Sequence, residues 1–108
     1  MIEQIGSEAF DARVRASTRP VVVVDFFGQT CPPCQKLLPI LEVLAAELDD
    51  DVDFVKVDAA EAEDLAVEFG VTSVPTVVFF KDGGMVGKIV GLTAKSKLAS
   101  AIQDLLSQ

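Results

Sequence analysis

The sequence predicts an α/β fold in which helices cover both faces of a central mixed β-sheet. The segment PVVVVDFF, Pro20–Phe27, is too continuously apolar for a strand with one solvent face. A segment with helical spacing separates it from a second strand, DFVKVD, at Asp53–Asp58. The run TVVFF, Thr76–Phe80, then passes through KDGG into MVGKIV, which predicts a hairpin. A strand–helix–strand unit followed by a hairpin gives a sheet with parallel and antiparallel pairs.

The remaining elements are helices. A first helix is expected over Ser7–Ala16, with its leading serine as the N-cap. A short helix over Glu61–Phe69 ends before Gly70, which suits a left-handed cap. A last helix runs from an N-cap at Thr93 to Leu106. The long helix after the cysteines carries its apolar residues at helical spacing, at Leu37, Leu38, Leu41, Leu44, Ala45 and Leu48.

Length and composition indicate one globular domain, residues 1–108. A chain of 108 residues is large enough to enclose a single core, and its composition of 50% hydrophobic and 24% charged residues differs from that of disordered chains. The first ten residues, MIEQIGSEAF, lack the basic and apolar regions of a signal peptide. No apolar run approaches the ~20 residues of a membrane span. We therefore expect a cytoplasmic protein without a membrane segment.

The net charge of −8 is concentrated in one region. One interpretation is a solvated edge that aids solubility, and the other is a patch that selects or repels partners. Either way, repulsion from phosphate disfavours nucleic acids and anionic membranes as partners. Nine of the 17 acidic residues fall within 18 positions, namely Glu47, Asp49, Asp50, Asp51, Asp53, Asp58, Glu61, Glu63 and Asp64.

The two cysteines of the chain, Cys31 and Cys34, lie in the segment QTCPPCQK. A structural zinc site needs about four ligands, and this chain has two cysteines and no histidine. A disulfide that closes so short a loop contributes only about 2 kcal/mol by loop entropy, and lasting structural disulfides are rare in the cytoplasm. A metal site and a structural disulfide stay open as alternatives, but a redox pair is favoured, and we expect no metal and no cofactor.

The position of the pair predicts different roles for its two sulfurs. The segment lies where a buried strand ends and a helix begins, the edge at which open α/β folds build their sites. At the helix N-terminus, the macrodipole and free N–H groups favour a thiolate at Cys31. Cys34 lies one turn further on and is expected to be less accessible. We therefore expect Cys31 to attack and Cys34 to resolve.

Several motifs together resemble the thioredoxin family, and the resemblance covers essentially the whole chain. They are VVVVDFF followed by CPPC, Pro39 within the long helix, FVKVD, GVTSVPTVVFFKDG and the late Gly91, in the family's order and spacing. The resemblance implies the thioredoxin fold and a redox-active Cys31–Cys34 disulfide.

The resemblance also implies a role for Asp25, which follows four valines. It implies a buried carboxyl with a raised pKa that accepts a proton from Cys34 through water. Lys56 in the adjacent strand would tune this carboxyl. The alternatives are an Asp25 side chain that reaches solvent or caps a backbone N–H, and a Lys56 that is merely an exposed strand residue.

Pro75 corresponds to the cis-proline of the family's substrate loop. A proline that merely opens a strand is the alternative. The resemblance implies that the Val74–Pro75 peptide bond is cis and faces the cysteine pair. It also implies that the Val74 backbone pairs with an extended substrate segment and that Gly91 contributes to substrate binding.

The chain departs from the family's usual active-site sequence. Thr30 stands where tryptophan usually precedes the first cysteine, Pro32 and Pro33 replace Gly-Pro, and Gln35 replaces the common lysine. The two prolines remove N–H donors near Cys31, which predicts a higher thiol pKa and a more reducing protein. The Cys-Pro-His-Cys of periplasmic disulfide oxidases is similar and points to a stronger oxidant, and we favour this second prediction.

The sequence therefore predicts a thiol–disulfide oxidoreductase that is less reducing than ordinary thioredoxin and has isomerase character. Thr30, Pro32, Val74, Pro75 and Gly91 are the expected substrate contacts. The resemblance implies protein disulfides as substrates, a flavoprotein disulfide reductase as electron donor and a monomeric chain. The alternative is a redox-inactive binding module that docks a partner through the same loop.

Overall fold

A five-stranded sheet forms the centre of the protein in a computed structural model that describes residues 1–108. The strand order is β1–β3–β2–β4–β5. β3 is parallel to both β1 and β2, whereas β4 is antiparallel to β2 and β5. The predicted mixed sheet is therefore confirmed. The strands are β1 (Glu3–Gln4), β2 (Val21–Phe27), β3 (Val52–Asp58), β4 (Thr76–Lys81) and β5 (Gly84–Val90).

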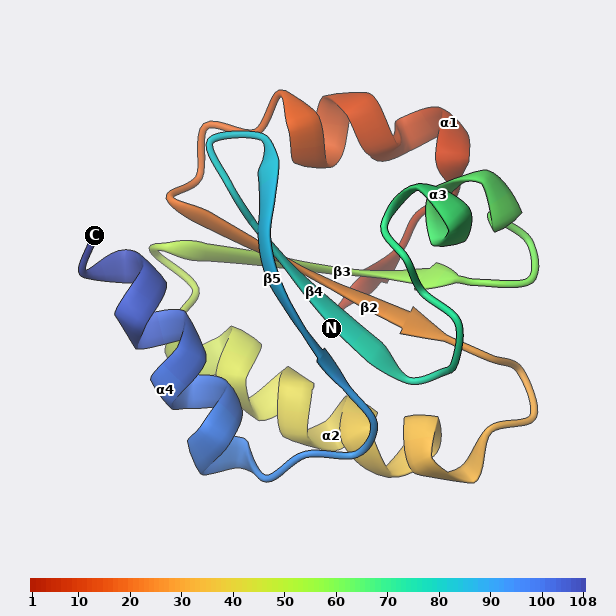
Figure 1. Ribbon diagram of the computed structural model, residues 1–108. Coiled ribbons are helices and arrows are strands. Elements are labelled where there is room, and N and C mark those ends of the chain that lie inside the picture. The colour runs from red at the N-terminus through yellow and green to blue at the C-terminus, as the bar shows by residue number, and fades with distance from the viewer.

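Helices cover both faces of the sheet, as predicted (Figure 1). One face carries α1 and α3, and the opposite face carries α2 and α4. The first helix includes a π-helical segment, η1, directly after α1. The helices are α1 (Ser7–Phe10), η1 (Asp11–Arg15), α2 (Pro32–Glu47), α3 (Glu63–Glu68) and α4 (Lys95–Leu106).

The four valines of β2 supply both halves of the core. Successive side chains of a strand point to opposite faces. Val22 and Val24 accordingly pack in the cluster that includes residues of α1 and α3, while Val21 and Val23 pack in the cluster of α2 and α4. All four are at most 2% exposed, which explains the continuous apolar run. The same alternation points Asp25 toward α2.

Two expected helix caps are wrong. α1 begins at Ser7 itself, with Gly6 at the N-cap, and the Ser7 hydroxyl donates to Asp64 instead. α4 has Ala94 at its N-cap, and the Thr93 hydroxyl donates to the carbonyl of Gly91. In both cases the hydroxyl donates to an acceptor outside the helix and does not cap it.

Gly70 does adopt the predicted left-handed conformation after α3, with φ of 67°. The carbonyl of this glycine accepts a hydrogen bond of 2.8 Å from Lys88 Nζ on β5. A cation at a helix C-terminus is favourable because of the carbonyls that end there. This contact fixes the start of the segment that leads to Pro75.

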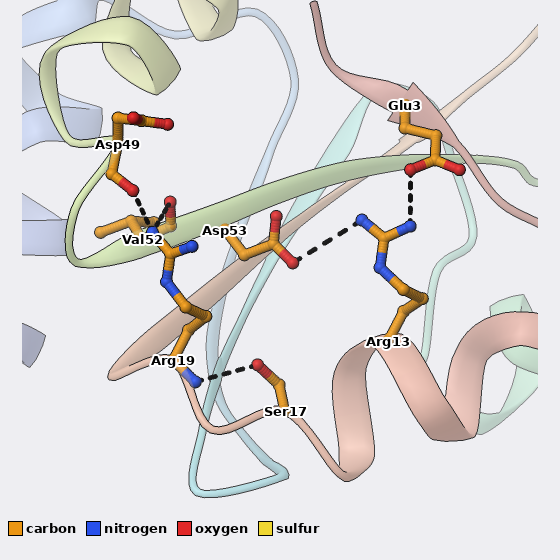
Figure 2. Close-up of polar contacts among 7 residues, drawn as sticks. All are labelled: Glu3, Arg13, Ser17, Arg19, Asp49, Val52 and Asp53. Atoms are coloured by element: carbon orange, nitrogen blue, oxygen red, sulfur yellow. Dashed lines mark hydrogen bonds and ion pairs between the residues drawn. The ribbon is translucent and has the colours of Figure 1, made fainter.

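Arginines tie the N-terminal segment to β3 (Figure 2). Arg13 lies between Glu3 on β1, at 2.6 Å, and Asp53 on β3, at 3.7 Å. The Arg19 guanidinium donates to the carbonyls of Asp49 and Val52. These contacts hold the short β1 and the start of β3 together.

Other members of the acidic 47–64 region also have partners within the chain. Glu47 pairs with Lys95 at 2.9 Å, and Asp64 accepts the hydroxyl of Ser7 at 2.6 Å. Part of this region therefore contributes to contacts between elements.

Candidate functional site

The first turn of α2 is organised around the Cys31–Cys34 disulfide. Cys31 is the N-cap, with extended backbone angles of φ −131° and ψ 96°. An N-cap side chain accepts an N–H from the second or third residue of its helix. Pro33 is the second residue and has no N–H, so Cys34, the third, is the remaining donor. Its N–H donates to Cys31 Sγ at 3.2 Å. The two prolines thus leave one backbone donor for this sulfur.

Exposure distinguishes the two cysteines only slightly. Cys31 is 7% exposed and Cys34 is 4% exposed, so both are buried in the disulfide state. The direction agrees with the expectation, but the difference is small. The capping position of Cys31 is the clearer distinction, because this sulfur faces the helix N-terminus.

Asp25 is a buried carboxyl near the end of β2. It is 2% exposed, and its Oδ1 has no hydrogen-bond partner. Burial raises the pKa of Asp25 to about 7 from an ordinary 3.8, while the nearby charge of Lys56 opposes this rise. The alternative of a side chain that reaches solvent or caps a backbone N–H is therefore wrong. A carboxyl of this kind can take up and release a proton near neutral pH.

A cavity of about 150 Å³ connects this carboxyl with the disulfide. Asp25 from β2, Lys56 from β3 and Cys34 from α2 all line it. Asp25 and Lys56 are also register partners in the parallel pair β2–β3. The volume is sufficient for a water molecule, and Asp25 and Lys56 offer it polar groups. The remaining lining residues are Phe27, Gly28, Gln29, Gln35 and Leu38.

The loop before β4 lies beside the cysteines. The Val74–Pro75 peptide bond is cis, the conformation that the sequence resemblance implies. A Cβ built on Gly28 would lie 3.2 Å from Val74 Cγ2 and 3.6 Å from the Cβ of Cys31. Gly28 therefore lies between the cysteine loop and the Val74 loop, where a Cβ would be in tight contact with the Val74 side chain.

Gly91 lies on the other side of the same loop. Its N–H donates to the carbonyl of Pro75 at 2.8 Å, and its φ of 91° favours glycine. Thr30, Pro32 and Pro33 are exposed beside Cys31. The structure thus brings the expected contact residues to one end of the molecule, around the disulfide.

A groove of about 330 Å³ runs beside the Val74 loop. Most of the residues that line it are hydrophobic, whereas fewer than half of those that line the cavity at Asp25 are. Phe27 and Gly28 from the end of β2 contribute to it. The other lining residues are Ala59, Ala60, Ala66, Val71, Thr72, Ser73 and Val74.

Sequence reasoning missed three residues at this site. Gly28 was missed, although a glycine between a buried strand and a cysteine signals close backbone approach. Asp58 was counted only as part of the acidic region, yet it is 2% exposed. It is the last residue of β3, and Asp25 likewise lies near the end of β2. The sequence contained no signal for Gln29, which donates to Asp58.

Together, these features define a class of protein. When a disulfide at a helix N-terminus is reduced, the resulting dithiol can exchange with another disulfide, because the helix N-terminus stabilises the attacking thiolate. The buried carboxyl across the cavity can serve the associated proton transfer. The chain is a thiol–disulfide oxidoreductase with a thioredoxin fold.

Comparison with known proteins identifies the family. The thioredoxin family model matches residues 1–104. Thioredoxin C-2 of Corynebacterium nephridii is 41% identical over 97 residues, covering 90% of this chain and 89% of that protein. A Staphylococcus aureus thioredoxin is 37% identical over 105 residues, covering 97% and 98%. The chain therefore belongs to the thioredoxin family.

A solved structure agrees with this assignment. Oxidized mitochondrial thioredoxin 3 from Saccharomyces cerevisiae superposes with a TM-score of 0.84 at 35% identity, covering 95% of this chain and 94% of that one. Members of the family act on protein disulfides and are usually reduced by a flavoprotein thioredoxin reductase. None of the helices has the length and apolar composition needed to cross a membrane.

Proposed function

We propose that the protein exchanges its Cys31–Cys34 dithiol with protein disulfides, is less reducing than ordinary thioredoxin and isomerises non-native disulfides. The observation that carries the assignment of roles is the capping position of Cys31. Its sulfur accepts the N–H of Cys34 at the start of α2. A thiolate at this point benefits from that hydrogen bond and from the helix macrodipole.

In the first step, the Cys31 thiolate attacks one sulfur of a substrate disulfide. A bond forms between Cys31 Sγ and that sulfur, the substrate S–S bond breaks, and the other substrate sulfur leaves as a thiolate. The product is a mixed disulfide between Cys31 and the substrate. Cys34 is still a thiol at this stage.

In the second step, the Asp25 carboxylate accepts the proton of the Cys34 thiol through water in the shared cavity. The Cys34 thiolate then attacks Cys31 Sγ, which forms the Cys31–Cys34 disulfide and releases the second substrate sulfur as a thiolate. Two electrons have passed to the substrate, and solvent or Asp25 protonates the thiolates. A pKa of about 7 suits Asp25 to this transfer, because the group is partly ionised at neutral pH.

The substrate segment binds across the exposed end of the molecule. The backbone of Val74 pairs with an extended segment beside Cys31, in the manner of a short added strand. Pro75 and Gly91 support this loop through the hydrogen bond between them. Thr30 and Pro32 contact the same segment, and neither side chain offers the aromatic surface of a tryptophan.

The redox character follows from the first turn of α2. Pro32 and Pro33 stiffen the turn and fix the position of Cys31 against the helix N-terminus. This preorganisation stabilises the thiolate more than the lost N–H donors destabilise it. A more stable thiolate makes the dithiol form more favourable and the disulfide more oxidising.

Equilibration with glutathione tests this proposal. We expect a potential less negative than the roughly −270 mV of a reducing thioredoxin. We also expect slower reduction of insulin disulfides and faster recovery of scrambled ribonuclease than a reference thioredoxin gives. A potential and an insulin rate that both match the reference would contradict the proposed redox character.

The same proposal covers the oligomeric state of the protein and its location in the cell. We expect residues 1–108 to act as one domain, as a monomer and in the cytoplasm, with no bound cofactor. Sedimentation of the reduced and oxidised forms tests the monomer.

A further inference from the structure

A side-chain hydrogen bond links the loop before Cys31 to the end of β3. Gln29 Nε2 donates to Asp58 Oδ2 at 2.8 Å. The other carboxylate oxygen of Asp58 accepts the N–H of Ala60 at 2.9 Å and that of Glu61 at 3.4 Å. One buried carboxylate is therefore shared between the turn after β3 and the cysteine loop.

Backbone hydrogen bonds hold the two ends of this bridge in place. The N–H of Ala59 donates to the carbonyl of Phe27 at 3.0 Å, and the N–H of Ala62 donates to the carbonyl of Asp58 at 2.9 Å. These bonds fix where the cysteine loop leaves β2 and where the turn leaves β3. The Gln29 side chain spans the distance that remains between them.

Gln29 also lines the cavity that contains Asp25 and Cys34. Its own side chain is exposed, whereas Asp58 is 2% exposed, so Asp58 anchors a side chain that borders solvent. Among the residues that line the cavity, the charged or titratable ones besides Asp25 are Lys56 and Cys34. The side chain of Gln29 adds no charge to the cavity.

We infer that Gln29, held by Asp58, is a positioning residue that limits the entry of solvent into the cavity between Asp25 and Cys34. This inference deepens the proposed function and rests on it, since it assumes that Asp25 accepts the proton of Cys34. Gln29 touches none of the reacting atoms. It acts on the second step of the reaction through the environment of Asp25.

Shortening the side chain of Gln29 should lower the pKa of Asp25. Burial is the main cause of the raised pKa of Asp25, with Lys56 opposing it. A shorter side chain at position 29 lets water approach Asp25, which weakens the effect of burial and lowers its pKa. The charge of Asp58 is not among the causes of the rise. Replacing that charge while keeping the hydrogen bond should therefore leave the pKa of Asp25 unchanged.

The test follows the second step directly. Reduced protein is mixed with an equimolar aromatic disulfide, 5,5′-dithiobis(2-nitrobenzoate), which releases a coloured thiolate in each of the two steps. The second, unimolecular release reports the attack of Cys34 on the mixed disulfide. Its rate is measured between pH 5 and pH 9, about two units on either side of the pKa of Asp25.

We expect Gln29→Ala to move the pH midpoint of this phase down by about one unit. Asp58→Asn should keep the wild-type midpoint, because its amide can donate to Gln29 Oε1 after the Gln29 amide turns over and its oxygen can still accept from Ala60. Gln103→Ala, on the exposed surface of α4, is the matched control and should also keep the wild-type midpoint.

Asp25→Asn distinguishes the two ways of failing. If Asp25→Asn abolishes the midpoint but Gln29→Ala keeps it at the wild-type value, the inference about Gln29 is overturned and the role of Asp25 stands. A Gln29→Ala variant with a changed rate but an unchanged midpoint would also overturn the inference about Gln29. If Asp25→Asn retains the wild-type pH dependence, the proposed role of Asp25 fails and the inference fails with it.

Discussion

Replacing Asp25 by asparagine should stabilise the oxidised protein more at neutral pH than in acid. In the folded protein the pKa of Asp25 is about 7, roughly 3 units above the ordinary 3.8. Each unit corresponds to about 1.4 kcal/mol of unfolding free energy. Ionising Asp25 in the folded protein therefore costs about 4 kcal/mol relative to the unfolded chain.

The sign follows from the order of the two pKa values. Below pH 3.8 the carboxyl is protonated in both states, and its contribution to stability is present in full. As the pH rises toward the folded-state pKa of about 7, the unfolded chain releases this proton first, so wild-type stability falls. The asparagine variant has no such proton, and its advantage should grow over this range and then level off.

Urea unfolding at a series of pH values measures this difference. Circular dichroism is the appropriate probe, because the chain contains no tryptophan or tyrosine. The buried amide adds a pH-independent offset, so the informative quantity is the change in the difference between the two proteins. Asp104→Asn, which removes an exposed carboxyl on α4, is the control. A difference between Asp25→Asn and wild type that is constant over the whole range would refute the buried acid.

Two further predictions concern the redox character and Lys56. Pro32→Gly combined with Thr30→Trp should shift the glutathione potential to more negative values and speed insulin reduction, because glycine restores a backbone donor and tryptophan restores apolar docking surface. An unchanged potential would mean that these two positions do not set it. Lys56→Met removes the charge that lowers the pKa of Asp25. The pH midpoint of mixed-disulfide resolution should therefore rise, whereas a midpoint that stays or falls would show that Lys56 does not tune Asp25.

Much of the fold could be predicted because hydrophobic periodicity decides it. The run of valines before Asp25 required cover on both faces, and the structure provides two helices on each. β1 was not predicted, because a strand of two exposed residues leaves no periodic signal. The helix caps at Ser7 and Thr93 were predicted wrongly, since each hydroxyl had a competing acceptor that only the tertiary structure brings near.

Some residues of the candidate site could also be predicted from the sequence, and others could not. The two cysteines and Asp25 could be recognised from the sequence, because a cysteine pair at a helix start and an acid within an apolar strand have few alternative explanations. Asp58 and Gln29 could not, since an acid in an acidic region and a polar loop residue look like ordinary surface. Their relation depends on the parallel pairing of β2 and β3, which brings the ends of the two strands together.

Trapping of the mixed disulfide tests the central claim, that Cys31 attacks and Cys34 resolves, most directly. Reduced Cys34→Ser and Cys31→Ser variants are incubated with insulin, and the adducts are resolved on non-reducing gels. The capping position of Cys31 predicts a long-lived adduct with Cys34→Ser, little adduct with Cys31→Ser, and turnover without accumulation in the wild type. Equal adducts from both variants, or more from Cys31→Ser, would contradict the assignment.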